Sequence, residues 1–248
     1  MKKVALISGV SSGIGNATAK VFSQKGWHVI GVARKNVSAI DGVSHYIRGD
    51  VSNVSDISHI FDEIRSNEGR IDVLINNAAI QICKPIIEMS VDEWDKTMDT
   101  NLRSAFLFSK HAYPLMKEKG GTIINVSSVH AIATSSNIAA YAASKGALAA
   151  FTRALAIELA HDNIRVNAVL PGAVDTPMLR SGLQREHVVG SSVEERIDCL
   201  AKKHISGRIG KPEDIGWTIL FLADPRSSFI TGQTIIIDGG ATARLSTE

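Results

Sequence analysis

A strand pattern over residues 122–127 is followed, after a polar loop, by a helix pattern over residues 141–159. The first segment is β-branched and apolar, and the second has apolar residues at helical spacing. Ser128 lies at the exit of the strand. Tyr141 and Lys145 are four residues apart and share one face of the helix. Because ligands of open α/β folds bind where strands end, a hydroxyl, a phenol and an ammonium are predicted to meet at such a site.

These three groups suit the transfer of a hydride to or from a carbon–oxygen bond. A tyrosine titrates near ~10, and a nearby cation such as Lys145 lowers the pKa of a phenol. Tyr141 could then exchange a proton with an alcohol or carbonyl oxygen, to which Ser128 donates a hydrogen bond. The alternative is that Tyr141 and Lys145 are ordinary surface residues of a helix. The remaining motifs of the chain decide between these two interpretations.

A glycine-rich turn joins a predicted strand at residues 4–8 to a predicted helix at about residues 15–25. The Gly-x3-Gly-x-Gly spacing lets the backbone approach a pyrophosphate at the positive end of the helix. No Gly-Lys-Ser/Thr follows, which excludes a Walker loop. The cofactor-binding residues predicted in this turn are Gly9, Ser11, Ser12, Gly13, Ile14 and Gly15.

The second and third strands, predicted at residues 27–33 and 44–48, indicate the form of the cofactor. Arg34 and Lys35 follow the second strand where an acidic residue would bind the ribose of NAD, so NADP(H) is expected over NAD(H). The alternative is that Arg34 and Lys35 are charged side chains of a loop that are simply solvated. After the third strand, Asp50 and Val51 are expected at the adenine, although Asp50 could merely cap the next helix.

Strands alternate with helices along the whole chain, which predicts a doubly wound, mostly parallel seven-stranded sheet with helices on both faces. The other strands are expected at residues 72–75, 164–170 and 233–237, and the other helices at 53–65, from Ser90 through a break into 101–117, and at 212–222. One catalytic domain, residues 1–248, is expected. The polar, charge-rich residues 175–206 are predicted to form an irregular substrate lid.

Composition excludes several other classes of protein. The 248 residues carry a net charge of +2 without a basic stripe, so no nucleic-acid partner is expected. Two cysteines fit a reduced cytoplasm. The apolar run after Met1 is broken at Ser8-Gly9, too early for a signal peptide, and no run approaches a membrane span. Neither a membrane partner nor a metal site is predicted.

Taken together, the chain resembles the short-chain dehydrogenase/reductase family in its compact single-domain branch, from about Val4 to Gly240. The motifs that carry the resemblance are Gly9/Gly13/Gly15, Asp50, Asn76-Asn77-Ala78, Asn101, Ser128, Tyr141, Lys145 and Pro171-Gly172. Ser128 rather than Ser127 matches the family's separation of 13 residues from the tyrosine. Two departures are mild: Ser8 replaces the usual Thr, and Ala79 the usual Gly.

The resemblance implies a catalytic tetrad of Asn101, Ser128, Tyr141 and Lys145, in which Asn101 holds a water that relays protons to Lys145. It also implies further cofactor-binding residues, namely Asn77, Ala78, Pro171, Gly172, Val174 and Thr176. Pairing of two helices in a homotetramer is implied too. In this chain those helices, at residues 98–118 and 141–160, carry Phe106, Phe108, Leu148 and Phe151, which suggests burial on more than one side.

Several functions remain open at this point. A non-catalytic NADP(H) sensor would not need Ser128, Tyr141 and Lys145 together, and a sugar-nucleotide epimerase of the longer branch would need more chain. Gln81, His130 and Asn137 are expected at the substrate. These polar residues favour a sugar or polyol, because a pocket for acyl chains or steroids would be mainly apolar. The short link between the second and third strands and residues 229–232 are also similar to those of sugar dehydrogenases of the family. A 3-oxoacyl-thioester reductase or a general ketoreductase is the alternative.

Overall fold

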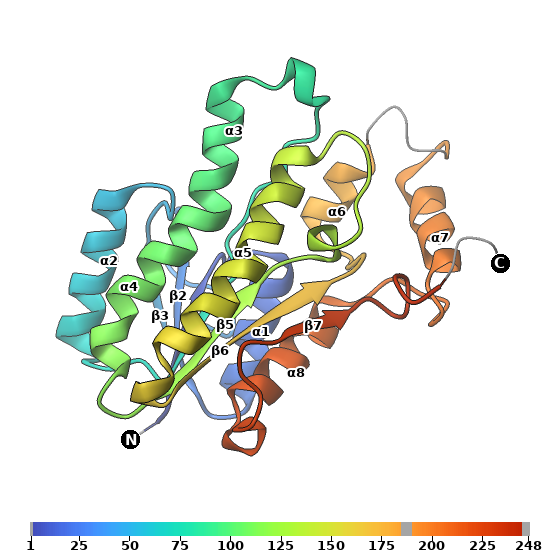
Figure 1. The fold of residues 1–248 in the computed structure, drawn as a ribbon. Helices are drawn as coiled ribbons and strands as arrows, with labels where there is room; N and C mark the ends of the chain where they lie inside the picture. The colour runs from blue at the N-terminus through green and yellow to red at the C-terminus, as the bar shows by residue number, and fades with distance from the viewer. Residues whose placement is uncertain (1, 185–189, 245–248) are drawn as a thin grey trace.

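A computed structural model describes residues 2–184 and 190–244, and these form a parallel seven-stranded sheet between two layers of helices (Figure 1). The strand order is β3-β2-β1-β4-β5-β6-β7, so the winding direction reverses between β1 and β4. The predicted fold class is therefore confirmed. The strands are β1 Val4–Ser8, β2 His28–Ala33, β3 His45–Arg48, β4 Val73–Asn76, β5 Gly121–Val126, β6 Ile164–Pro171 and β7 Thr234–Ile237.

Two groups of helices cover the sheet (Figure 1). One face carries α1 (Gly13–Gln24) and α8 (Pro212–Ala223), and the other carries α2 (Val54–Asn67), α4 (Ser104–Met116) and α5 (Ala139–Glu158). The remaining α-helices are α3 Val91–Met98, α6 Pro177–Gly182 and α7 Val193–Lys203. Short 3-10 turns occupy Ile86–Glu88, Val129–Ala131, Ala160–Asp162 and Pro225–Ser227.

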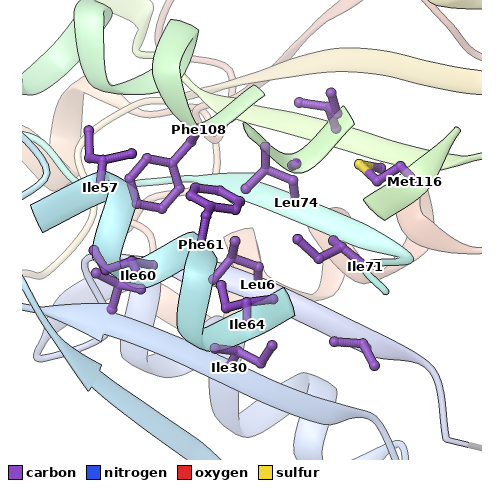
Figure 2. Close-up of a cluster of buried hydrophobic side chains, with 14 of the residues drawn as sticks. Leu6, Ile30, Ile57, Ile60, Phe61, Ile64, Ile71, Leu74, Phe108 and Met116 are labelled. Carbon is purple, nitrogen blue, oxygen red and sulfur yellow. The ribbon is translucent and has the colours of Figure 1, made fainter. Parts of the chain in front are cut away.

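Successive residues of the central strand β1 enter two different cores. Leu6 packs with α2 and α4, whereas Ala5 and Ile7 pack on the side of α1 and α8. On the α2 side, the rings of Phe61 and Phe108 meet edge to face with their centroids 5.2 Å apart (Figure 2). Such two-sided burial explains why the strands are continuous apolar runs, as parallel strands usually are.

Helices α3 and α4 are joined by one π-helical segment, Asp99–Arg103, at the break that the sequence predicted. The α3 helix starts at a capping box, in which Ser90 accepts from the Glu93 amide and the Glu93 carboxylate accepts from the Ser90 amide. Asn101 lies inside the π-helical segment and is buried. Single π turns of this kind often occur at functional sites.

A chain of buried amide and hydroxyl groups crosses from the sheet into α5. Asn76 of β4 donates to the Asn125 side chain of β5 at 2.8 Å, and Asn125 donates to the Thr152 hydroxyl at 2.9 Å. Thr152 donates in turn to the Leu148 carbonyl of its own helix. Because each member is paired, these polar groups are buried without the penalty of an unmade hydrogen bond.

The segment predicted as an irregular lid is partly helical, which corrects that prediction. Thr176 caps α6 by accepting from the Leu179 amide, and Ser192 caps α7 by accepting from the Glu195 amide. Arg180 ties the two helices together, since its guanidinium contacts the carboxylates of Asp175 and Glu194. Positions 185–189 of the predicted lid lie outside the described residues.

Among residues 2–184 and 190–244, no helix is long and apolar enough to cross a membrane. The same residues contain no group of three or more His, Cys, Asp and Glu side chains that could hold a metal ion.

Candidate active site

A cavity of about 480 Å³ lies at the carboxyl ends of the strands, above the point where the winding direction reverses. The segments that follow β1, β2, β3, β4, β5 and β6 all contribute to its wall, together with α5 and the lid helices. This is the place where doubly wound folds bind dinucleotides and their substrates.

The glycine turn after β1 is packed too tightly for side chains. A Cβ atom at Gly15 would lie 2.2 Å from the Gly9 carbonyl oxygen, and Gly9 itself has a φ of +77°. The Asn77 side-chain amide donates to the carbonyls of Ser8 and Gly9, and the Ser8 hydroxyl accepts from the Asn77 and Ala78 amides. These hydrogen bonds connect the glycine turn to the segment after β4. The Ser8 hydroxyl contributes two of them as the acceptor.

The amino end of α1 faces the cavity with no side chain capping it. Ser12 occupies the N-cap position, yet its hydroxyl accepts no hydrogen bond from the first turn, unlike the caps of α2, α3, α6 and α7. Ser11, Ser12 and Gly13 line the cavity here, and Thr176 lies against Gly13. Uncapped amides at a positive helix end fit the pyrophosphate of a dinucleotide.

Ser128, Tyr141 and Lys145 come together as their spacing predicted. The Ser128 hydroxyl lies near enough to the Tyr141 phenol to lower its pKa, and the Lys145 Nζ lies 5.6 Å from the centre of the Tyr141 ring. All three side chains are buried and line the cavity. Ser127 points elsewhere, because its hydroxyl donates to the Lys145 carbonyl.

The pKa values of this pair differ from the expectation that Lys145 lowers the pKa of Tyr141. Burial raises the pKa of Tyr141 to about 12, although the hydrogen bond with Ser128 acts in the opposite direction. Burial also lowers the pKa of Lys145 to about 7. The Lys145 amine donates to the Val126 carbonyl rather than to the phenol. Without a cofactor, the site therefore holds a protonated tyrosine.

Asn101 lies behind the cavity rather than in its wall. Its side-chain oxygen accepts from the Ile80 amide at 2.8 Å, and its nitrogen donates to the Ile80 carbonyl at 2.9 Å and to the Ser144 hydroxyl at 3.1 Å. Ile80 does line the cavity. The Asn101 side chain thus holds the segment after β4 against α5.

Arg34, Asp50 and Val51 line the other end of the cavity, where an adenosine is expected. The Arg34 guanidinium lies 3.7 Å from the Asp50 carboxylate. Hydrogen bonds from Ser52 and the charge of Arg34 outweigh burial and hold the pKa of Asp50 below its usual value. Lys35 is exposed and does not line the cavity.

Two of the three predicted substrate residues, Gln81 and His130, line the cavity, and the His130 ring meets Tyr141 edge to face. Asn137 does not line it. Asn137 has a φ of +65°, and its carbonyl accepts from the Lys84 amide. The left-handed backbone turns the chain into α5 at this point.

Most predicted cofactor residues do lie in the cavity wall, namely Gly9, Ser11, Ser12, Gly13, Ile14, Arg34, Asp50, Val51, Asn77, Ala78, Pro171, Gly172, Val174 and Thr176. Gly15 and Lys35 do not. The sequence reasoning missed an apolar wall opposite the glycine turn, formed by Ile80, Val129, Met178, Leu179, Leu183 and Leu200. The last four are apolar residues scattered over a charge-rich segment without a regular period, so periodicity gave little signal.

Comparisons with known proteins agree with this geometry. A family model described as enoyl-(acyl carrier protein) reductase matches residues 9–242. The 3-oxoacyl-(acyl-carrier-protein) reductase FabG of Thermotoga maritima is 39% identical over 248 residues, which cover 96% of this chain and 97% of the relative. Cyclopentanol dehydrogenase of Comamonas testosteroni is 34% identical, with 97% of both chains covered.

A solved structure, the ligand-free aldohexose dehydrogenase of Thermoplasma acidophilum, superposes with a TM-score of 0.93 at 35% sequence identity. The match covers 99% of this chain and 96% of that one. A cavity at the switch point, the serine, tyrosine and lysine buried in its wall, and relatives matched over nearly their whole length all lead to one conclusion. The chain belongs to the short-chain dehydrogenase/reductase family of enzymes, which use a nicotinamide dinucleotide to interconvert alcohols and carbonyls.

Proposed function

We propose that this protein is an NADP(H)-dependent ketoreductase in which Asn101, Ser128, Tyr141 and Lys145 form the catalytic tetrad. The observation that carries the proposal is that the buried side chains of Ser128, Tyr141 and Lys145 line the same cavity, with the Lys145 Nζ 5.6 Å from the centre of the Tyr141 ring. Two hydroxyls that converge in this way can bind one substrate oxygen.

In this mechanism the cofactor supplies or accepts the hydride. Ser128 donates a hydrogen bond to the carbonyl oxygen and polarises it. Tyr141 gives its phenolic proton to the same oxygen as the alcohol forms, and takes a proton back in the oxidation direction. A pKa of about 12 for Tyr141 keeps that proton in place at neutral pH, which suits the reduction of a carbonyl. Asn101 positions the wall of the site through Ile80.

The residues around the cavity also fit the rest of an NADP(H) molecule. The uncapped amino end of α1 would hold the pyrophosphate, Asp50 and Val51 the adenine, and Arg34 the 2′-phosphate. Asn77, Ala78, Pro171, Gly172, Val174 and Thr176 line the end where the nicotinamide would lie. Arginine is well suited to a phosphate because its fork of donors binds two oxygens.

The substrate end of the cavity favours a mainly apolar ketone or 3-oxoacyl thioester. Six apolar side chains, from the segments after β4 and β5 and from the lid, line the cavity together with the polar Gln81, His130 and Ser135. The relatives that reduce a 3-oxoacyl group or oxidise cyclopentanol agree with such a wall. An aldose remains the second candidate, because Gln81 and His130 could bind hydroxyls and because the aldohexose dehydrogenase superposes closely.

A substrate panel tests this function directly. Purified protein is mixed with NADPH and, in turn, acetoacetyl thioester, cyclopentanone and cyclohexanone, and with NADP⁺ and aldoses or polyols. Absorbance of the reduced nicotinamide reports turnover. Turnover of the ketones or thioester supports the proposal, turnover of aldoses alone supports the second candidate, and no turnover with any of them contradicts both.

We also propose a cytoplasmic homo-oligomer, a tetramer, with residues 1–248 as one catalytic domain and residues 175–206 as its substrate lid. Phe108 and Leu148, two of the four residues that suggested burial on more than one side, are buried in this chain's own core. The outer face of α4 and α5 still presents Phe106, 45% exposed, and Ile157, 80% exposed. Apolar side chains at such a face support pairing with another copy.

A further inference from the structure

A second, shallower hollow opens beside the adenosine end of the cavity. Its wall consists of Arg34, Arg48, Gly49, Asp50, Ser55, Asp56 and His59. Arg34, Gly49 and Asp50 belong to both walls, so the hollow continues the cavity outwards between the end of β3 and the start of α2. We call it the β3 annex.

The charges of the annex show that Arg34 alone is a weak phosphate ligand. Its guanidinium already lies 3.7 Å from the Asp50 carboxylate, and the Asp56 carboxylate accepts from the Asp50 amide close by. Arg34 with these two carboxylates carries a net charge of −1. A phosphate monoester brings about −1.5 to −2 more at neutral pH, so like charges would repel it. A second cation is needed, and Arg48 brings the set to zero.

Arg48 is held beside Arg34 by the backbone. It ends strand β3, pairs in register with Ala33 of β2, and donates from Nε to the Arg34 carbonyl at 3.4 Å. In the described part of the chain, its two terminal nitrogens make no hydrogen bond, so both are available to an anion. The distance between these two nitrogens of the planar guanidinium matches the distance between two oxygens of a phosphate.

The neighbouring Tyr46 strengthens this arrangement. Its hydroxyl contacts the Ala33 carbonyl at 2.9 Å and the Lys35 carbonyl at 2.6 Å. The Tyr46 hydroxyl can donate to one of these two carbonyls at a time, and Arg48 donates to the Arg34 carbonyl between them, so two side chains of β3 contact the backbone at the end of β2. The backbone of Arg34 is thereby positioned beside Arg48 before any ligand binds. Preorganised donors lose less entropy on binding.

We propose that Arg48 is a second specificity-determining residue, which binds the 2′-phosphate of the cofactor in the β3 annex together with Arg34. The proposal rests on the proposed use of NADP(H). It assigns to Arg48 a contact that distinguishes the two nicotinamide dinucleotides, and to Tyr46 the positioning of the segment that carries Arg34.

Calorimetric titration with two cofactor fragments tests the assignment without turnover. Wild type, Arg48→Gln, Arg34→Ala and the control Arg65→Gln are each titrated with 2′,5′-ADP and with 5′-AMP. Arg65 lies on the outer side of α2, paired with Asp62, so its replacement makes the same change in charge away from the annex. Arg48→Gln should weaken 2′,5′-ADP binding about 10- to 100-fold. It should leave 5′-AMP binding unchanged, which also reports an intact fold.

The outcomes separate the two proposals. Equal affinity of the wild type for 2′,5′-ADP and 5′-AMP would contradict the proposed use of NADP(H). A strong preference for 2′,5′-ADP that falls in Arg34→Ala but not in Arg48→Gln would overturn the role of Arg48 alone. An equal loss of 2′,5′-ADP affinity in Arg65→Gln and Arg48→Gln would show that the net charge of the protein, not the position of Arg48, determines the affinity. That result also overturns the proposal.

Discussion

The Lys145 amine donates a 2.7 Å hydrogen bond to the carbonyl of Val126, the last residue of β5. Helix α5 is thereby fastened to the strand that leads into Ser128, and the amine is held below the tyrosine ring instead of at its hydroxyl. The same burial that makes this bond possible lowers the pKa of Lys145 to about 7. One backbone carbonyl thus links the helix of Tyr141 and Lys145 to the strand that precedes Ser128.

Replacing Tyr141 by Phe should abolish turnover while leaving cofactor binding nearly intact. The ring still packs in the wall, but the proton donor is gone, and general acid catalysis is typically worth about 10²–10⁴-fold in rate. Steady-state kinetics with the best ketone would measure the loss, and NADPH fluorescence would measure binding. A variant that keeps the kcat of the wild type would contradict the mechanism.

Replacing Lys145 by Met should change how stability depends on pH. Between about pH 7 and 10 the unfolded chain binds a proton at Lys145 that the folded protein does not, so the stability of the wild type rises with pH across this window. The variant lacks this rise. Its Tm relative to wild type should therefore fall steadily from pH 7 to pH 10, as measured by thermal melts.

The exposed Lys96 provides the matched control for that experiment. Lys96→Met removes the same charge from a solvated position on α3, so its Tm difference from wild type should stay nearly constant. A constant difference for Lys145→Met as well would mean that burial does not depress the pKa of Lys145.

Replacing Arg34 by Ala should lower kcat/KM for NADPH about 10- to 100-fold, the loss expected for hydrogen bonds to a charged group. The value for NADH should change little, because no 2′-phosphate is present to lose its partner. Initial rates with both cofactors at limiting concentration measure the two values. Equal losses for NADPH and NADH would indicate that Arg34 supports the shape of the loop instead of binding a phosphate.

Replacing Asn101 by Ala should destabilise the protein by about 1–3 kcal/mol, because the amide and carbonyl of Ile80 lose the partners that the buried Asn101 side chain supplies. It should also lower kcat, since Ile80 lines the cavity. Urea unfolding and steady-state kinetics measure the two effects. A lower kcat with an unchanged unfolding midpoint would favour the proton relay implied by the family over a positioning role.

Replacing Phe106 by Glu should reduce the mass measured by light scattering, because a carboxylate would be buried at the face of α4 and α5. Val54→Glu is a suitable control, since Val54 is 52% exposed at the start of α2, away from that face. A monomeric wild type at micromolar concentration would contradict the proposed oligomer.

Sequence patterns predicted the strands well, because buried parallel strands are apolar on both sides and leave little ambiguity. They predicted the positions of Ser128, Tyr141 and Lys145 for a similar reason, since strand ends and helix periodicity place side chains reliably. The lid helices were missed because α6 has only six residues and α7 is charge-rich. Their starts depend on the caps at Thr176 and Ser192.

Properties that depend on tertiary packing could not be predicted in this way. Asn137 was assigned to the site because it precedes Tyr141 closely in sequence, but its left-handed backbone directs the chain elsewhere. The raised pKa of Tyr141 follows from how deeply α5 buries the phenol, and the bond from Lys145 to Val126 follows from how closely α5 approaches β5. The spacing of residues in the sequence determines neither how deeply the phenol is buried nor how closely α5 approaches β5.

The buried chain from Asn76 through Asn125 to Thr152 restricts how this fold can change over evolutionary time. Asn125 is bonded to both of the other two, so replacing Asn76 or Thr152 leaves a polar atom of Asn125 without its partner and costs about 1–3 kcal/mol. The loop after β4, the exit of β5 and the helix of Tyr141 are thus inherited as one unit. Lids and loops around them can diverge to new substrates while the relative placement of the reacting groups is passed on unaltered.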